Sequence, residues 1–136
     1  MLGIRKRYWV LLLLAFLAGL DWYMRAPDAQ SRALTRAIEA EGSEKLRNYP
    51  YQFWVMKVVN GTAYVSTPRN YEVPAAKALA AMYPDLNTRN PNDPKFIAAQ
   101  ELLGQVQTEA RAIVLEQPGI KAVEWSLDRD WVRSQF

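Results

Sequence analysis

The chain has 136 residues, which is enough for one compact domain after a short N-terminal segment, and it contains neither cysteine nor histidine. Their absence excludes disulfides, thiol nucleophiles, zinc sites built from these residues, c-type haem and any catalytic triad with an imidazole base, and we expect no cofactor and no bound metal. The formal net charge of +3 is carried by Arg5, Lys6 and Arg7 alone, so the remainder is neutral, lacks a basic stripe for phosphates and indicates no nucleic-acid partner.

Residues 1–25 form the first predicted unit, a transmembrane anchor. An uncharged run begins at Tyr8 and ends at Leu20, and aromatic pairs flank it, as is typical of rings that lie at the two membrane interfaces. As a helix, the interval from Tyr8 to Met24 would reach ~25 Å, the short end for a hydrocarbon core of ~30 Å. We therefore predict a lipid bilayer as one partner, with these membrane-interface residues: Arg5, Lys6, Arg7, Tyr8, Trp9, Trp22 and Tyr23.

A cleaved secretory signal is the alternative for this segment, because three cations followed by an apolar run are common to both. Signal cleavage needs small residues just before the cleaved bond. A site after Ala18 would lie inside the apolar run, and a site after Ala29 would place Pro27 where a small side chain is needed. In an uncleaved protein the cations stay in the cytoplasm. The topology predicted for a bacterium is a single pass through the inner membrane, with the N-terminus cytoplasmic and the C-terminal domain periplasmic.

Residues 26–48 form the second predicted unit, a connecting helix. A proline and an aspartate suit a helix start, and Leu34, Ala37 and Ile38 recur at helical spacing before Gly42 breaks the pattern. The apolar face is thin, so we interpret this segment as a helix on the surface of the domain or of the membrane. A docking helix for a partner is the alternative.

Residues 49–136 form the third predicted unit, a periplasmic α+β domain. It begins with a predicted hairpin, QFWVMKVVNGTAYVST, whose Asn60-Gly61 pair supplies the two positive φ angles of a type I′ turn. Asn60 also opens a glycosylation sequon, although the turn alone explains the motif. Pairing Val59 with Thr62 divides the side chains between two faces. One face carries Trp54, Met56, Val58, Ala63 and Val65, and the other carries Phe53, Val55, Lys57, Tyr64 and Ser66.

Two helices and a strand complete this domain. A short alanine-rich helix is expected over 73–83 and a longer one over 94–117, with Asp93 as the cap of the second. The alternation in IKAVEWSL is typical of a half-buried strand, and Asp128 follows it as the cap of a terminal turn over 129–134. The predicted fold class is therefore α+β, an antiparallel sheet of three strands with helices packed on one face.

Two segments carry residues suited to chemistry. In LDRDW, Asp128 and Asp130 form a carboxylate pair that could serve acid–base catalysis or hold a hard cation, although helix capping explains the same residues. In STPRN, Arg69 and Asn70 precede a helix N-terminus and could receive an anion or a carboxylate from a partner, although turn chemistry explains them as well. The sequence has no glycine-rich phosphate loop and no serine–lysine pair at the spacing of acyl enzymes.

Aromatic residues indicate a binding edge ahead of the hairpin. Tyr51 and Phe53 precede a strand whose two faces are both largely apolar, and Tyr64 lies on the partner strand. Such side chains line ligand grooves and interfaces, but most serve as core residues. The candidate ligand- or partner-binding residues are Arg69, Asn70, Tyr51, Phe53, Tyr64, Asp128 and Asp130, and we expect no catalytic residue.

Much of the chain is covered by three segments, YPYQFWVMKVVNGTAYVSTPRNYEVPAAKAL, PNDPKFIAAQELLGQVQTEARAIVLEQPGI and WSLDRDW. Together they resemble a family of small uncharacterised proteobacterial envelope proteins with one N-terminal hydrophobic segment. The resemblance implies an envelope topology and no catalytic residues.

We therefore expect a non-catalytic, membrane-anchored periplasmic interaction or accessory protein of a cell-envelope complex, with another envelope protein as its partner. A small periplasmic ligand-binding or hydrolase domain that uses Asp128, Asp130, Arg69 or a tyrosine is the first alternative. A transmembrane subunit that contributes one span to a helix bundle, with Gly19 and Asp21 at the contact, is the second.

Overall fold

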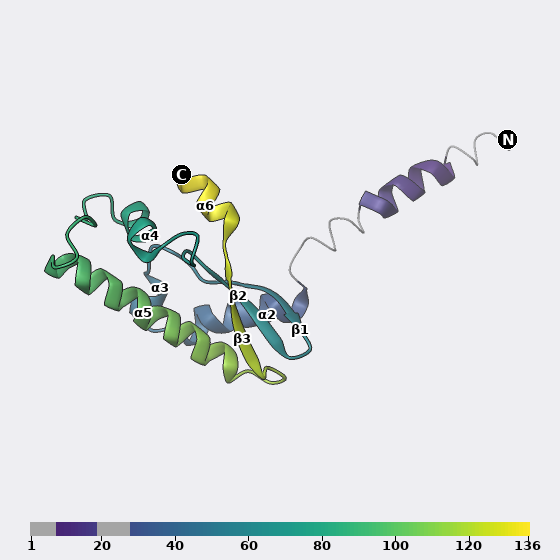
Figure 1. Cartoon of the computed structure of the whole chain (residues 1–136). Coiled ribbons are helices and arrows are strands. Elements are labelled where there is room, and N and C mark those ends of the chain that lie inside the picture. The colour runs from purple at the N-terminus through teal and green to yellow at the C-terminus, as the bar shows by residue number, and fades with distance from the viewer. Residues whose placement is uncertain (1–7, 19–27) are drawn as a thin grey trace.

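The computed structural model describes residues 8–18 and 28–136 of the chain (Figure 1). Residues 8–18 are helical. The elements that follow are, in order, α2 (Ala29–Glu41), α3 (Glu44–Arg47), β1 (Val55–Val59), β2 (Thr62–Thr67), α4 (Ala75–Met82), α5 (Pro94–Leu115), β3 (Ala122–Leu127) and α6 (Arg129–Gln135). The predicted α+β class and the three-stranded sheet are confirmed.

No helix within the described residues combines the length and the apolar character needed to cross a membrane. Of the predicted anchor, the structure describes residues 8–18, and all 11 of them are helical. The prediction of a single-pass transmembrane anchor over 1–25 is therefore wrong, and so are the inner-membrane location and the topology drawn from it.

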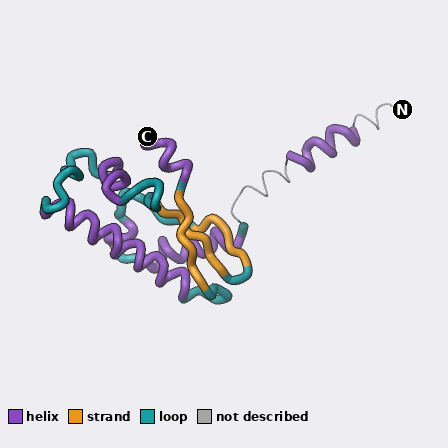
Figure 2. Tube along the Cα trace, in the orientation of Figure 1, coloured by secondary structure: helices purple, strands orange, loops and turns teal. Residues whose placement is uncertain are grey.

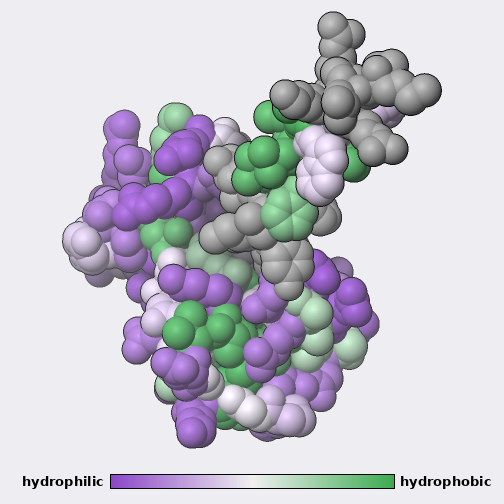
Figure 3. All heavy atoms as spheres, turned by 90° about the vertical axis from the view of Figure 1, so that its right-hand side faces the viewer, coloured by the Kyte–Doolittle hydropathy of each residue, from purple (hydrophilic) through white to green (hydrophobic). Residues whose placement is uncertain are grey.

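Tyr8 and Trp9, two of the predicted membrane-interface residues, lie in the helix at 8–18 with 63% and 74% of their surface exposed. The other large apolar side chains of this helix are exposed as well, and they contribute green spheres beside the grey atoms in Figure 3. The remaining residues of the two membrane predictions lie outside the described residues: Arg5, Lys6, Arg7, Gly19, Asp21, Trp22 and Tyr23.

The hairpin of β1 and β2 forms as predicted. Asn60 and Gly61 adopt φ angles of 49° and 80°, the left-handed conformation that a two-residue turn between twisted strands requires. Val59 pairs with Thr62 in an antiparallel ladder. The turn chemistry of two neighbouring residues therefore sets the register of this half of the sheet.

The third strand runs parallel to β2, so the prediction of a purely antiparallel sheet is wrong. Figure 2 shows the three strands side by side. In the sequence, the long helix α5 comes after β2 and before β3. With 22 residues, α5 is ~33 Å long and returns the chain to the end of the sheet at which β2 begins. There the Lys121 N–H donates to the Gly61 carbonyl at 2.7 Å, and β3 starts beside Thr62. A helix that crosses the length of a sheet makes the next strand parallel.

A bulge in β1 changes which side chains face the core. The ladder pairs Val55 with Val65 and Lys57 with Tyr64, so one extra residue, Met56, lies in β1 between these pairs. Val55 therefore shares the buried face of Val65, and both are completely buried. The predicted faces were wrong for the first half of β1. Tyr51, Phe53 and Val55 are buried, whereas Trp54 and Met56 are only partly covered.

The core lies between the sheet and two helices, α2 and α5, which contact each other and the same face of the strands. Asp28 caps the start of helix α2 with a carboxylate that accepts from the Ser31 N–H at 2.7 Å, and the helix buries Leu34 and Ile38. Helix α5 is capped by Asp93, as predicted, and contributes a buried stripe. That stripe comprises Phe96, Leu103, Val106, Gln107, Ala110, Ile113 and Val114.

The opposite face of the sheet is only partly covered, although Ser66 is buried there. Lys57 and Glu124 are exposed there, and the Lys57 ammonium lies 4.7 Å from the centre of the Tyr64 ring. At the hairpin end Val59 is 47% exposed. Figure 3 looks toward this end and shows apolar surface bordered by polar residues.

The outer edge of β1 is hydrogen-bonded to α2 through the side chain of Thr35. The Thr35 hydroxyl accepts from the Val55 N–H at 2.9 Å and donates to the Ser31 carbonyl at 3.0 Å. Val55 is fully buried, so its N–H has no access to water. The hydroxyl therefore supplies a partner that a buried amide requires.

Thr35→Val keeps the shape of the side chain but removes that partner. We expect the free energy of unfolding, measured by urea denaturation of the full chain, to fall by about 1–3 kcal/mol, the penalty for an unpaired buried amide. Thr35→Ser keeps the hydroxyl and should lose clearly less. Equal stability of Thr35→Val and the unsubstituted protein would show that this bond does not stabilise the fold.

Candidate functional site: a basic cleft between α5 and β3

A cleft of about 510 Å³ opens where α5 and β3 diverge. Figure 1 shows these two elements close together at the loop over 116–121 and farther apart toward α6. The strand wall is formed by Trp125 and Leu127, and the loop that follows β2 reaches the cleft with Arg69, Asn70 and Tyr71. The volume lies within the range of ~300–1,000 Å³ that ligand sites occupy.

The helix wall of the cleft is a single stripe of α5. Gly104, Gln107, Thr108 and Arg111 stand at positions i, i+3, i+4 and i+7, so they lie on one side of the helix. Gly104 has no side chain, and a Cβ built there would meet no atom within 4 Å. The glycine therefore leaves open space in the cleft wall.

A buried amide side chain holds Arg69 at the cleft. Gln107 is only 8% exposed. Its Nε2 donates to the Thr67 hydroxyl at 3.0 Å, and its Oε1 accepts from Arg69 Nε at 2.9 Å. Thr67, itself 2% exposed, also bonds the backbone of Arg69. The two terminal nitrogens of the guanidinium take no part in these bonds.

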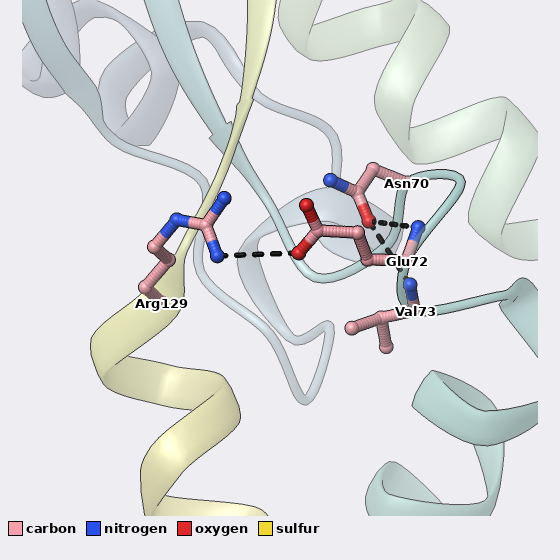
Figure 4. Close-up of polar contacts among 4 residues, drawn as sticks. All are labelled: Asn70, Glu72, Val73 and Arg129. Carbon is pink, nitrogen blue, oxygen red and sulfur yellow. Dashed lines mark hydrogen bonds and ion pairs between the residues drawn. The ribbon is translucent and has the colours of Figure 1, made fainter.

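Two further side chains of the loop that carries Arg69, those of Asn70 and Glu72, hold it in place (Figure 4). The Asn70 side-chain oxygen accepts from the N–H groups of Glu72 and Val73 at 2.8 and 3.0 Å, an arrangement that closes a tight turn. The Glu72 carboxylate pairs with Arg129 at the start of α6 at 3.2 Å. Asn70 therefore shapes the loop with its oxygen, and the exposed ion pair contributes little energy but ties the loop to α6.

The cleft is positively charged. Arg69 and Arg111 both line it, and no acidic side chain does so among the described residues. The ion pairs within that part of the chain are Glu72 with Arg129 and Asp130 with Arg133, so neither cleft arginine has a carboxylate partner. A guanidinium presents its N–H groups in a planar fork that matches a carboxylate or a phosphate. The arrangement is therefore suited to an anionic group.

Asp128, a predicted candidate for binding or chemistry, is engaged in hydrogen bonds that stabilise the fold. It is 7% exposed and accepts from the Tyr51 hydroxyl at 2.7 Å, the Trp54 indole N–H at 3.0 Å and the Trp131 backbone N–H at 3.1 Å. The last of these bonds caps α6, as the sequence predicted. Three donors leave this carboxylate little capacity for a substrate.

The other predicted residues are dispersed. Asp130 is exposed and lies 3.7 Å from Arg133 in the first turns of α6. Tyr51 and Phe53 are buried, with ring centres 5.1 Å apart, and Tyr64 lies on the partly covered face of the sheet. Of the seven candidates, the cleft brings together Arg69 and Asn70.

Sequence reasoning missed the residues that α5 and β3 contribute to the cleft. Gln107 occupies the buried stripe of α5, four residues after Leu103, where a polar side chain is unusual and carries a signal. Gly104 in the middle of a long helix is a second signal, because glycine weakens helices. Arg111 and Trp125 have no local feature that marks them as cleft residues.

Another hollow on the described surface is less suited to an anionic ligand. It has a volume of about 360 Å³ and lies between the end of α4 and the start of α5, and its two charges, Asp85 and Lys95, are of opposite sign. Within the same described surface, no group of three or more acidic side chains gathers at a place suited to a metal ion.

Comparisons with protein-family models, with curated protein sequences and with solved structures found no match for this chain. The resemblance to a family of envelope proteins therefore stays a prediction, and function has to be argued from the cleft.

Buried tyrosines make the fold sensitive to alkaline pH. Burial raises the pKa of Tyr51 and of Tyr49 far above the usual value of 10.0, and burial also raises the pKa of Tyr83. The folded protein thus retains phenolic protons that the unfolded chain loses near pH 10. This part of the stability is complete below about pH 10 and is lost as the pH rises further.

We expect the free energy of unfolding to be level from pH 7 to 9 and to decline steeply above pH 10, as measured by urea denaturation at each pH. Tyr51→Phe should make the decline shallower and should lower stability at pH 7 by about 1–2 kcal/mol, because Asp128 loses a bond. Tyr71→Phe is the control, since Tyr71 is 92% exposed and should leave the slope unchanged. A slope that Tyr51→Phe does not alter would refute this account.

Gly104→Ala should stabilise the protein. The methyl group meets no atom, and alanine removes the entropic cost of a helical glycine, so we expect a gain of about 0.5–1 kcal/mol in urea denaturation. Ala112→Gly, at an exposed position of the same helix, is the matched reverse substitution and should lose a similar amount. A less stable Gly104→Ala variant would mean that the space beside Gly104 is already filled.

Proposed function

We propose that this protein is a non-catalytic binding domain that holds a carboxylate-bearing segment of another protein in the cleft between α5 and β3. The observation that carries the proposal is the pair Arg69 and Arg111, two guanidinium groups that share one cleft without an acidic neighbour among the described residues. Buried Gln107 positions the first of them before any ligand arrives, which reduces the entropy lost on binding.

The surroundings of the arginines favour a protein partner. Tyr71 is 92% exposed at the cleft, and Trp125 contributes to the strand wall. Tyrosine, tryptophan and arginine are the residues enriched where proteins bind one another, because each combines a large contact area with a polar group. A segment of a second protein can place apolar side chains on these rings and a carboxylate between the arginines.

The hydrolase alternative has less support. Asp128 is occupied by three hydrogen-bond donors, and Asp130 points into solvent beside Arg133. Neither lines the cleft that contains Arg69. A catalytic carboxylate has to reach the bond that it cleaves, and neither of these carboxylates lies beside the candidate anion site.

The proposal is tested by titrating the ¹⁵N-labelled full chain with the heptapeptide acetyl-Thr-Glu-Thr-Val-Thr-Glu-Thr-amide and following amide chemical shifts. We expect saturable shifts at the residues of the cleft, with an affinity that weakens as salt is raised. The double variant Arg69→Gln/Arg111→Gln should bind at least about tenfold more weakly, a loss of ~1.4 kcal/mol.

Two controls test whether binding depends on the charges of the cleft arginines and of the peptide glutamates. Arg89→Gln removes one positive charge from a loop outside the cleft, and this variant should bind the peptide normally. The peptide with glutamine in place of both glutamates should bind the unsubstituted protein as weakly as the double variant binds the acidic peptide. Shifts confined to other surfaces, or equal affinity of the double variant, would overturn the proposal.

A further inference from the structure

The two edges of the sheet differ in what covers them. Along β1, helix α2 packs on the strand, and the Thr35 hydroxyl bonds the Val55 N–H. Strand β3 is the other edge. Its backbone hydrogen bonds, as far as the described residues show, all go to β2 or to the residues beside β2. Alternate N–H and C=O groups of β3 therefore face outward without a partner strand.

The open edge of β3 lies directly beside the cleft. Trp125 pairs with Val65 and Leu127 with Thr67, so both side chains stand on the core face of the sheet, where they form the strand wall of the cleft. The α5 stripe from Gly104 to Arg111 forms the facing wall. An edge strand with a helix across a groove is the arrangement in which extended peptides add to a sheet.

We infer that the partner segment binds in an extended conformation, as a fourth strand hydrogen-bonded to the free edge of β3, with every second side chain pointing into the cleft. This inference rests on the proposed function and names the conformation of the partner. The backbone of the segment satisfies the unpaired edge groups of β3, and the alternate side chains reach the two walls.

The chemistry of the cleft specifies which side chains should alternate. The side chains that point inward meet Trp125 and Leu127 on one wall and the unpaired guanidinium of Arg111 on the other, with Arg69 at the loop. An apolar residue flanked by acidic residues at alternate positions complements this set. The side chains that point outward lie beside exposed Glu124 and partly covered Ser126, so small polar residues such as threonine suit them. The heptapeptide used above follows this pattern.

The test uses that heptapeptide in two N-methylated forms, one methylated on the central valine and one on the threonine that follows it. Successive backbone N–H groups of a strand point to opposite sides, so only one of the two methyl groups can fall between the peptide and β3. We expect one form to bind the full chain at least about tenfold more weakly and the other to bind within about twofold of the parent peptide. Hydrogen exchange of β3 amides should slow on binding of the parent peptide, whereas exchange in β1 should not change.

The outcomes separate the two proposals. Equal affinities of the two methylated forms, together with unchanged exchange in β3, would overturn strand addition while the arginine-dependent binding of the parent peptide still stands. A parent peptide that does not bind in the cleft would overturn the proposed function and this inference with it. Slower hydrogen exchange in β1 and unchanged exchange in β3 would mean that the peptide pairs with β1, and this result would also refute the inference.

Discussion

The cleft depends on the side-chain amide of Gln107. This group is withdrawn from water, so both its oxygen and its nitrogen require partners, and they find them in Arg69 and Thr67. The two bonds join α5 to the end of β2 and to the first residues of the following loop. Helix α5 cannot slide or rotate against the sheet without exposing unpaired polar atoms. The same bonds leave the ends of the Arg69 guanidinium at the cleft, so the geometry of the candidate anion site is a consequence of core packing.

A second polar centre lies at the same end of the sheet. Buried Asp128 gathers donors from Tyr51 and Trp54, which precede or begin the hairpin, and from Trp131 in α6. The carboxylate is hydrogen-bonded to these donors, and it does not line the cleft. The separation of the buried carboxylate from Arg69 and Arg111 keeps the two guanidinium groups available. One end of the sheet thus contains a carboxylate with three hydrogen-bond donors and, among the described residues, two arginines without a carboxylate partner.

Sequence reasoning succeeded where structure depends on neighbouring residues. The Asn60-Gly61 turn and the caps at Asp93 and Asp128 are local, and all three form as predicted. The bulge at Met56 and the direction of β3 depend on contacts between distant segments, and both were predicted wrongly. The residues of the candidate site also fall into those that a local motif predicts and those that depend on tertiary contacts. A loop motif identified Arg69 and Asn70, whereas the contribution of α5 emerges only when the helix lies across the sheet. A glutamine in an apolar stripe was the signal available beforehand.

The connection between β2 and β3 links the fold to the site. Because α5 crosses the whole sheet, β3 enters parallel to β2 and ends the sheet as an unpaired edge. Because α5 and β3 lie close together at the loop that joins them and farther apart toward α6, the two walls diverge, and the cleft opens beside that edge (Figure 1). Exposed edges invite pairing with other chains, and proteins usually block them. Here β1 is bulged and bonded to α2, while β3 keeps its free edge next to a groove that carries two cations, so the strand addition that we infer would favour chains that bring acidic side chains with them.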